Sequence, residues 1–127
     1  MKSKKANKFL EQHIFYDLEN LNDGFDSESI KYFNKKDFEK ILDRAEYFKL
    51  EIFGIEPWDN KCFSGVKIYE DYEMKSSDPQ WYRKAFEEFL ELGIQNYFSA
   101  SYGVPEELLK IFWYRKIIYW IILKKVL

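Results

Sequence analysis

Two acid-x-lysine pairs are the residues whose spacing could support catalysis: Asp59 with Lys61, and Glu73 with Lys75. Two carboxylates in one hairpin could hold a Mg²⁺ ion while Lys75 assists an attacking water, the arrangement of a Mg²⁺-dependent nuclease. A chain this rich in acids and lysines contains about three such pairs by chance. The pattern therefore favours a charged, solvated hairpin, and the nuclease stays as the alternative.

Other catalytic residue sets are incomplete in this sequence. His13 is the only histidine, and Cys62 is the only cysteine, so neither a zinc site nor an intrachain disulfide can be assembled. Ser99 and Ser101 lack the G-x-S-x-G context of a serine nucleophile, and the five glycines form no phosphate-binding loop. We therefore expect no enzymatic activity, no metal and no cofactor.

The charge distribution is uneven although the net charge is only −2. All 22 acidic residues lie between Glu11 and Glu107, a stretch with 11 basic residues and a net charge of −11. The basic N-terminal arm, residues 1–8, and the C-terminal segment, residues 108–127, carry the remaining bases and no acid. Such a field steers basic proteins toward the acidic middle and disfavours direct nucleic-acid binding. The alternative is an acidic surface that only aids solubility.

Carboxylates and large aromatic residues are mixed in the predicted hairpin region. Aromatic side chains supply desolvated anchors at protein interfaces, while carboxylates pair with lysine or arginine and accelerate encounter. We therefore predict partner binding here, with buried positions on the sheet face as the alternative for the tyrosines. The candidate residues are Glu56, Trp58, Asp59, Tyr69, Glu70, Asp71, Tyr72 and Glu73.

The elements that must position these residues follow from apolar periodicity and capping signals. Helical spacing predicts helices over 6–21, 35–48, 79–92 and 105–115, with Asn34 and Asp78 as N-caps and Gly93 after the third helix. Alternation predicts strands over 50–56, ended by Pro57, over 66–72 and over 94–102. The chain is thus expected to be one α+β domain spanning 1–127, with a small antiparallel sheet of about three strands packed against three to four helices.

The segment 108–127 is dominated by bulky apolar residues, but Arg115 and Lys116 interrupt it. Its longest uncharged run, Ile117 to Leu123, is too short to span a bilayer as a helix, so we expect no transmembrane span. Residues 116–127 suit either a helix or a strand. A core or dimer-forming element is favoured over a helix lying on anionic lipid, which leaves both a homodimer and peripheral membrane contact open.

The N-terminus has a charged opening without an apolar segment behind it, so no signal peptide is expected. Together with the single cysteine, this predicts a cytoplasmic protein.

Two stretches of the chain resemble a known group of proteins: Gly54 to Trp58, and Phe98 to Leu108. Over about residues 35–109 the sequence is similar to the small immunity proteins of bacterial contact-dependent growth inhibition and related polymorphic toxin systems. Those proteins are often acidic and bind and neutralise a cognate toxin domain, frequently a basic nuclease. The resemblance implies an immunity protein that covers the active site of a basic toxin domain.

Overall fold

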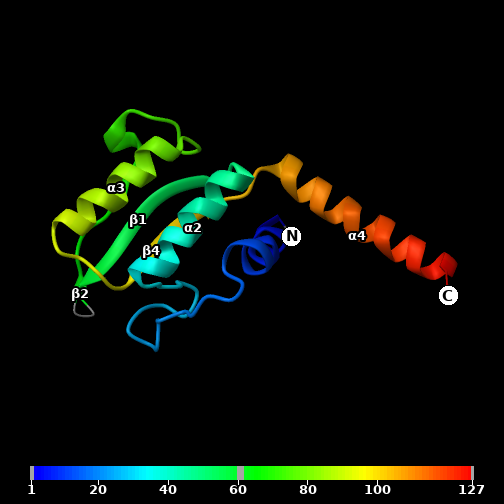
Figure 1. Cartoon of the computed structure of the whole chain (residues 1–127), viewed down its shortest axis with the longest axis horizontal. Helices are drawn as coiled ribbons and strands as arrows, with labels where there is room; N and C mark the ends of the chain where they lie inside the picture. Colours follow the sequence, from blue (N-terminus) through cyan, green and yellow to red (C-terminus); the bar gives the residue numbers. More distant parts are fainter. Residues whose placement is uncertain (1, 60–61, 127) are drawn as a thin grey trace.

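The computed structural model describes residues 2–59 and 62–126, and it confirms the predicted α+β fold (Figure 1). A long connection, residues 15–34, precedes α2. In chain order the elements are α1 (Lys2–Phe9), the π-helix η1 (Leu10–Ile14), α2 (Lys35–Phe48), β1 (Glu51–Asp59), β2 (Cys62–Phe63), β3 (Lys67–Ile68), the 3₁₀-helix η2 (Tyr69–Tyr72), α3 (Pro79–Glu91), β4 (Phe98–Gly103) and α4 (Glu106–Val126).

The sheet is built around β1. Its longest partner is β4, which runs antiparallel from the Glu51–Gly103 pair to the Pro57–Phe98 pair. The short strands β2 and β3 pair antiparallel with β1 at positions 58–59 and 54–55, respectively. Because Gly54 pairs with both Ile68 and Ser101, β3 and β4 lie on opposite edges of β1. β1 is therefore the central strand of the described sheet.

Pro57 does not end β1, contrary to the prediction from sequence, because the strand continues to Asp59. The carbonyl of Pro57 accepts a hydrogen bond from the Ser64 amide at 3.2 Å. The nitrogen and the carbonyl of one strand residue face the same edge of the strand. The Pro57 nitrogen, which carries no hydrogen, therefore faces the interruption between β2 and β3. On the other edge, the Trp58 amide donates to the Tyr97 carbonyl at 2.8 Å, so pairing there is retained.

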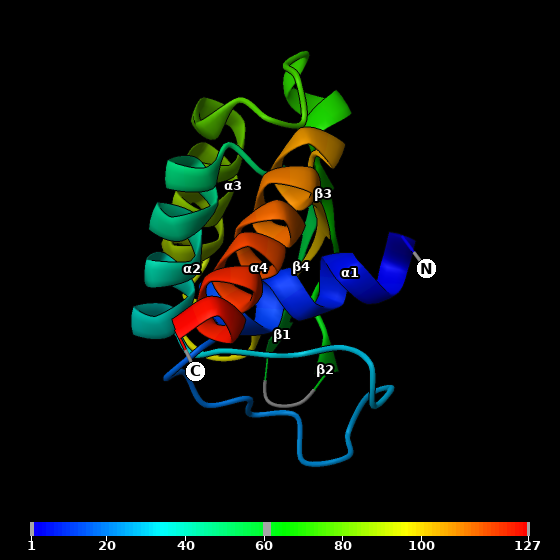
Figure 2. The same cartoon turned by 90° about the vertical axis from the view of Figure 1, so that its right-hand side faces the viewer.

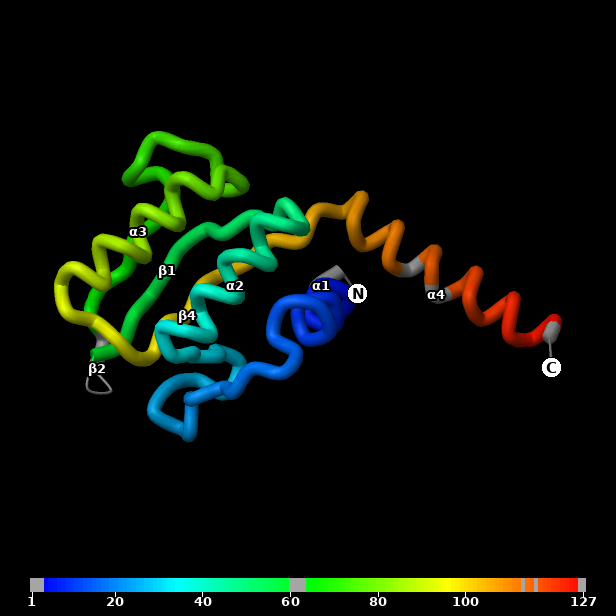
Figure 3. The backbone as a smooth tube through the Cα atoms, viewed as in Figure 1, coloured from blue at the N-terminus to red at the C-terminus, as the bar shows by residue number. Residues whose placement is uncertain are grey.

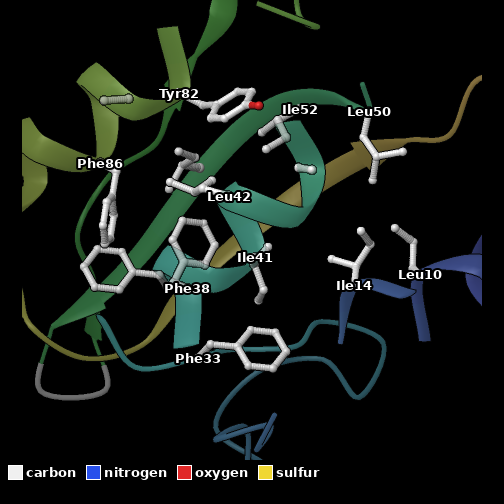
Figure 4. Packing of buried hydrophobic residues seen from close by; sticks show 14 of the residues in the cluster. Leu10, Ile14, Phe33, Phe38, Ile41, Leu42, Leu50, Ile52, Tyr82 and Phe86 are labelled. Atoms are coloured by element: carbon white, nitrogen blue, oxygen red, sulfur yellow. The ribbon is translucent and has the colours of Figure 1, made fainter. Parts of the chain in front are cut away.

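Helices α2 and α3 lie side by side on one face of the sheet (Figure 2). The buried stripe of α2 includes Phe38, Ile41 and Leu42, which meet the sheet and α3 in the cluster shown in Figure 4. From α3, Tyr82 and Phe86 enter the same cluster. The hydrophobic core thus fills the space between one sheet face and these two helices, and Leu10 and Ile14 of η1 join it.

The predicted caps of α2 and α3 are confirmed. The Asn34 side chain accepts from the Asp37 amide at 2.8 Å, and the Asp78 side chain accepts from the Gln80 amide at 2.9 Å. Gly93, just after α3, has a φ of +89°, the left-handed conformation that favours glycine. These local hydrogen bonds explain why both helices begin where the sequence predicts.

The N-terminal helix ends earlier than predicted. It starts at Lys2, so residues 2–8 of the basic arm are helical, and its last turn widens into η1, where Phe15 donates to the Leu10 carbonyl at 2.9 Å. The predicted continuation to Leu21 is wrong because Asp17 takes a positive φ of 62°. The Phe15 ring, stacked 5.3 Å from that of Phe33, packs the chain toward the sheet at this point.

The two other predicted strands are shorter than the apolar pattern indicates. In the predicted strand over 66–72, only Lys67–Ile68 pairs with β1, and Tyr69–Tyr72 forms η2. A 3₁₀-helix places residues i and i+3 on one side, so both tyrosines reach the Trp81 ring, which alternation in a strand would prevent. Similarly, β4 starts at Phe98 rather than at 94, after Tyr97 takes a positive φ of 61°.

The C-terminal segment is helical up to Val126, which decides the question that the sequence left open for residues 116–126. The predicted helix over 105–115 therefore continues without a break as α4. Figure 3 shows α4 projecting away from the sheet and from α2 and α3. No helix within residues 2–59 and 62–126 combines the length and the apolar character needed to cross a membrane.

Candidate protein-binding surface

The eight residues predicted to bind a partner fall into two groups at opposite ends of β1. Ile68, just before η2, pairs with Gly54, and the Ile52 amide donates to the Ser76 carbonyl at 3.0 Å. Residues 69–73 therefore lie near the start of the strand, while residues 56–59 form its end. At about 3.3 Å per residue, Gly54 and Asp59 are separated by about 16 Å. The groups do not form one contiguous hairpin surface.

The tyrosines of the first group pack against α3 from η2, and not from a sheet face as the alternative interpretation predicts. Tyr69 and Tyr72 lie with ring centroids 6.5 and 5.7 Å from Trp81. The Tyr72 hydroxyl donates to Glu88 at 2.5 Å, and burial followed by this hydrogen bond raises the pKa of Tyr72 above its usual value. Asp71 accepts from the Ile68 amide at 3.2 Å. The carboxylates of Glu70 and Glu73 are exposed, but neither Tyr69 nor Tyr72 is exposed beside them.

The second group joins a part of the chain that the sequence analysis left unassigned. The Trp58 indole donates to a carboxylate oxygen of Glu56 at 3.3 Å. Its ring lies 5.2 Å from that of Phe25 and 5.8 Å from that of Tyr32, and Phe25 also contacts Tyr97 at 5.3 Å. Trp58 is thus the point at which β1 meets the long connection before α2.

That connection contains a strongly acidic segment, residues 17–30, which we call the acidic loop. Its five acids are Asp17, Glu19, Asp23, Asp26 and Glu28, and it contains no lysine or arginine. Arg44 pairs with Asp17 at 3.0 Å and so offsets one of these charges. Counting charge over the whole middle of the chain conceals this local run, which is the signal by which the sequence could have indicated the site.

Asn22 holds the acidic loop in shape. Its side-chain oxygen accepts from the Gly24 amide at 3.1 Å, and its side-chain nitrogen donates to the Ser27 and Ile30 carbonyls at 2.9 and 2.8 Å. The Tyr32 amide also donates to the side-chain oxygen of Asn20 at 3.0 Å. Because asparagine can satisfy several backbone groups at once, it organises a loop without secondary structure.

Asp26 is oriented by a buried tyrosine. The Tyr32 hydroxyl donates to Asp26 at 2.6 Å, and the Ser27 amide donates to the same carboxylate at 2.7 Å. Burial, and then the hydrogen bond to Asp26, raise the pKa of Tyr32 above its usual value, which keeps the phenol protonated as a donor. Asp26 is therefore fixed next to the Phe25 ring rather than free to rotate.

Together these residues form a surface that we call the acidic–aromatic surface, at the end of β1. Figure 2 shows the connection passing beneath the end of β1 and β2. The surface combines the half-buried rings of Phe25, Trp58 and Tyr97 with the carboxylates of Asp26, Glu56 and Asp59, and the acidic loop adds the exposed Glu19 and Glu28. Three predicted residues, Glu56, Trp58 and Asp59, thus belong to it.

A hollow on the sheet face opposite α2 and α3 adjoins this surface. Its volume is about 250 Å³, and Phe53, Glu56, Val66 and Ser101 are among the lining residues. Glu56 is shared between the hollow and the acidic–aromatic surface. The hollow could receive an apolar or basic side chain of a partner, with a carboxylate at its edge.

The residues considered for catalysis are dispersed in this fold. Asp59 and Glu73 lie at opposite ends of β1, which removes the geometric basis of the paired-carboxylate site, and Lys61 lies outside the described residues. Within the described residues, no three histidine, cysteine or acidic side chains are grouped to hold a metal. The His13 ring packs against Phe9, Phe48 and Phe112, while the Ser99 hydroxyl donates to the Glu56 carbonyl at 2.9 Å.

Comparison with known proteins identifies no relative: no family model, no curated protein and no solved structure matches this chain.

Proposed function

We propose that this chain is an immunity protein that binds a cognate basic toxin domain through the acidic–aromatic surface and covers its active site. The packing of Trp58 on Phe25 carries this proposal, because it brings the strand carboxylates of Glu56 and Asp59 to the acidic loop. The resemblance of residues 35–109 to immunity proteins supports the same assignment. Under this proposal, the carboxylates take the positions of the phosphate groups that a nuclease toxin meets.

The physical character of the surface supports binding of a basic protein. Trp58 and Tyr97 are half-buried rings, which can be fully desolvated by a partner at low conformational cost. Glu19 and Glu28 are exposed, and carboxylates of this kind attract lysine and arginine before contact. Anchors surrounded by like charges suit tight, selective association with a cationic protein.

Two matched charge reversals test which acidic region binds. The variant E19K/E28K changes two exposed residues of the acidic loop, and E70K/E73K changes two exposed residues beside η2. Both variants shift the net charge equally. The proposal predicts that the gene immediately upstream encodes a protein with a basic C-terminal domain. This domain is co-expressed and purified with the chain, and affinity is measured by titration calorimetry at two salt concentrations.

We expect E19K/E28K to weaken the complex about ten- to a hundredfold and to reduce its salt dependence. E70K/E73K should bind within about threefold of the unaltered chain. Equal losses of affinity in both variants would mean that general charge attraction, and not the acidic–aromatic surface, accounts for binding. Full affinity in E19K/E28K, or no complex with the upstream domain, would contradict the proposal.

A further inference from the structure

Helix α4 is anchored to the rest of the protein only through its first turns, as far as the described residues show. Leu109 is buried, and the Phe112 ring lies 5.6 Å from Phe9 and 5.0 Å from His13. Beyond this point, every residue from 117 to 125 is exposed. Figures 1 and 3 show this second half extending away from the other elements.

The exposed part of α4 is unusually apolar. Its large hydrophobic side chains are between 40% and 67% exposed: Ile111, Tyr114, Ile117, Ile118, Tyr119, Trp120, Ile121, Ile122 and Leu123. Scattered exposed apolar residues are normal on a monomer, whereas a concentration of this kind on one helix marks a binding surface.

The distribution of these residues favours a protein partner over a lipid surface. A helix that lies on a membrane has one apolar face and one strongly charged face. Residues 117–123 are uncharged over two turns and therefore apolar on every side, and the helix is not suited to crossing a membrane. A helix that is apolar all round is normally buried among other protein elements.

One stripe of α4 has the spacing of a coiled-coil seam. Its residues are separated by four, three, four, three and four positions, and all of them are exposed: Glu107, Ile111, Tyr114, Ile118, Ile121 and Lys125. At about 100° per residue, this stripe lies on roughly the opposite side of the helix from Leu109 and Phe112. The seam is thus directed away from the body of its own chain.

We propose that two copies of this chain form a homodimer by packing their α4 seams antiparallel. The seam carries an acid at one end and a base at the other, so it is complementary to itself only in this orientation. Glu107 then meets Lys125 of the second copy, Ile111 meets Ile121, and Tyr114 meets Ile118. A parallel pair would instead place Glu107 beside Glu107 and align the helix dipoles unfavourably.

This arrangement covers the seam side of α4, which has no packing in the single chain. The exposed second half of each helix lies along the first half of the other, beside the 300 Å³ surface hollow that Ile111, Tyr114 and Ile118 line. The remaining elements of each copy, outside α4, stay at opposite ends of the helix pair, on the sides that face away from the seam. The dimer does not depend on toxin binding, because the acidic–aromatic surface belongs to a different part of the fold.

A pair of matched substitutions tests the seam. Ile118 lies in it and is 46% exposed, while Leu123 lies outside it and is 42% exposed. Sedimentation velocity of the full chain over a hundredfold range of concentration should show a dimer for the unaltered protein and for L123E. I118E should raise the dissociation constant at least a hundredfold, with circular dichroism confirming that it remains folded. A monomeric unaltered protein, or equal effects of the two substitutions, would overturn the seam.

A charge exchange tests the orientation. E107K and K125E should each weaken the dimer about tenfold, since each leaves like charges facing at both ends, and E107K/K125E should restore it. Loss of the dimer in the double variant would overturn the antiparallel arrangement. Sedimentation with phosphatidylserine-containing vesicles tests the lipid alternative. If the unaltered protein is a monomer that binds these vesicles, and I118E and L123E weaken this binding equally, α4 binds lipid instead of a second copy.

Discussion

The rings of Phe25 and Trp58 lie 5.2 Å apart, although the two residues are separated by the whole of α2 and most of β1. This contact attaches the acidic loop to the end of the central strand. It also decides which of the predicted carboxylates share a surface, because Glu56 and Asp59 come with Trp58 while residues 69–73 do not. Several consequences of the contact and of the surrounding packing can be measured.

Replacing the Phe25 ring should release the acidic loop. Phe25→Ala removes contacts with Trp58, Tyr32 and Tyr97, and we expect a loss of about 2 kcal/mol in the free energy of unfolding. Urea unfolding and limited proteolysis of residues 17–31 measure the two effects. Tyr47→Ala is the control, because Tyr47 is 80% exposed and its loss should cost little. An unchanged digestion pattern in Phe25→Ala would contradict the anchoring role.

Asn22 should be the residue on which the shape of the acidic loop depends most. Asn22→Ala leaves the Ser27 and Ile30 carbonyls and the Gly24 amide without their side-chain partner. We expect about 1–3 kcal/mol of destabilisation and faster amide exchange across residues 22–30. Ser29→Ala in the same loop should change exchange only locally. Slow exchange retained in Asn22→Ala would show that other contacts hold the loop.

The cap of α2 should contribute measurably to stability. Asn34→Ala removes the bond from the Asp37 amide, and we expect the free energy of unfolding to fall by about 1 kcal/mol. Asn34→Asp keeps a capping oxygen and should stay within about 0.5 kcal/mol of the unaltered protein. Thermal unfolding followed by circular dichroism distinguishes the two variants. Equal stability of Asn34→Ala and Asn34→Asp would refute the capping role.

Tyr82 should make the fold sensitive to alkaline pH. Burial, and to a lesser extent the charge of Glu46, raise the pKa of Tyr82 from 10.0 to about 12. Because the folded chain holds the neutral phenol and the unfolded chain ionises at about pH 10, this stabilisation is complete below pH 10 and is lost as pH rises to 12. The loss amounts to at most about 3 kcal/mol for this residue.

Tyr82→Phe should therefore lower the alkaline sensitivity, measured as the unfolding free energy between pH 9 and 12. Within the described residues, the Tyr82 hydroxyl is buried without a hydrogen-bond partner, so the substitution should cost little at pH 7. Tyr47→Phe, a control at a tyrosine that is 80% exposed, should leave the pH profile unchanged. Identical pH profiles for Tyr82→Phe and the unaltered chain would exclude Tyr82 as the source of the alkaline sensitivity.

The helices over 35–48 and 79–91 could be predicted because their signals are local. Asn34 and Asp78 cap them through bonds to amides two or three residues away, and the apolar spacing marks their buried faces. The same local signals misplace η2, because alternation in residues 66–72 is compatible with a strand. Packing of Tyr69 and Tyr72 on Trp81, a residue from another element, selects the 3₁₀-helix instead.

The sequence by itself determined the α+β composition of the fold, the starts of α2 and α3 and the mixture of acids and aromatics near Trp58, since periodicity, caps and charge are properties of short segments. Only the tertiary structure decided that Trp58 meets Phe25, that Pro57 lies within β1 and that residues 117–123 are exposed. Contacts between distant segments depend on how the core closes, which no local pattern records.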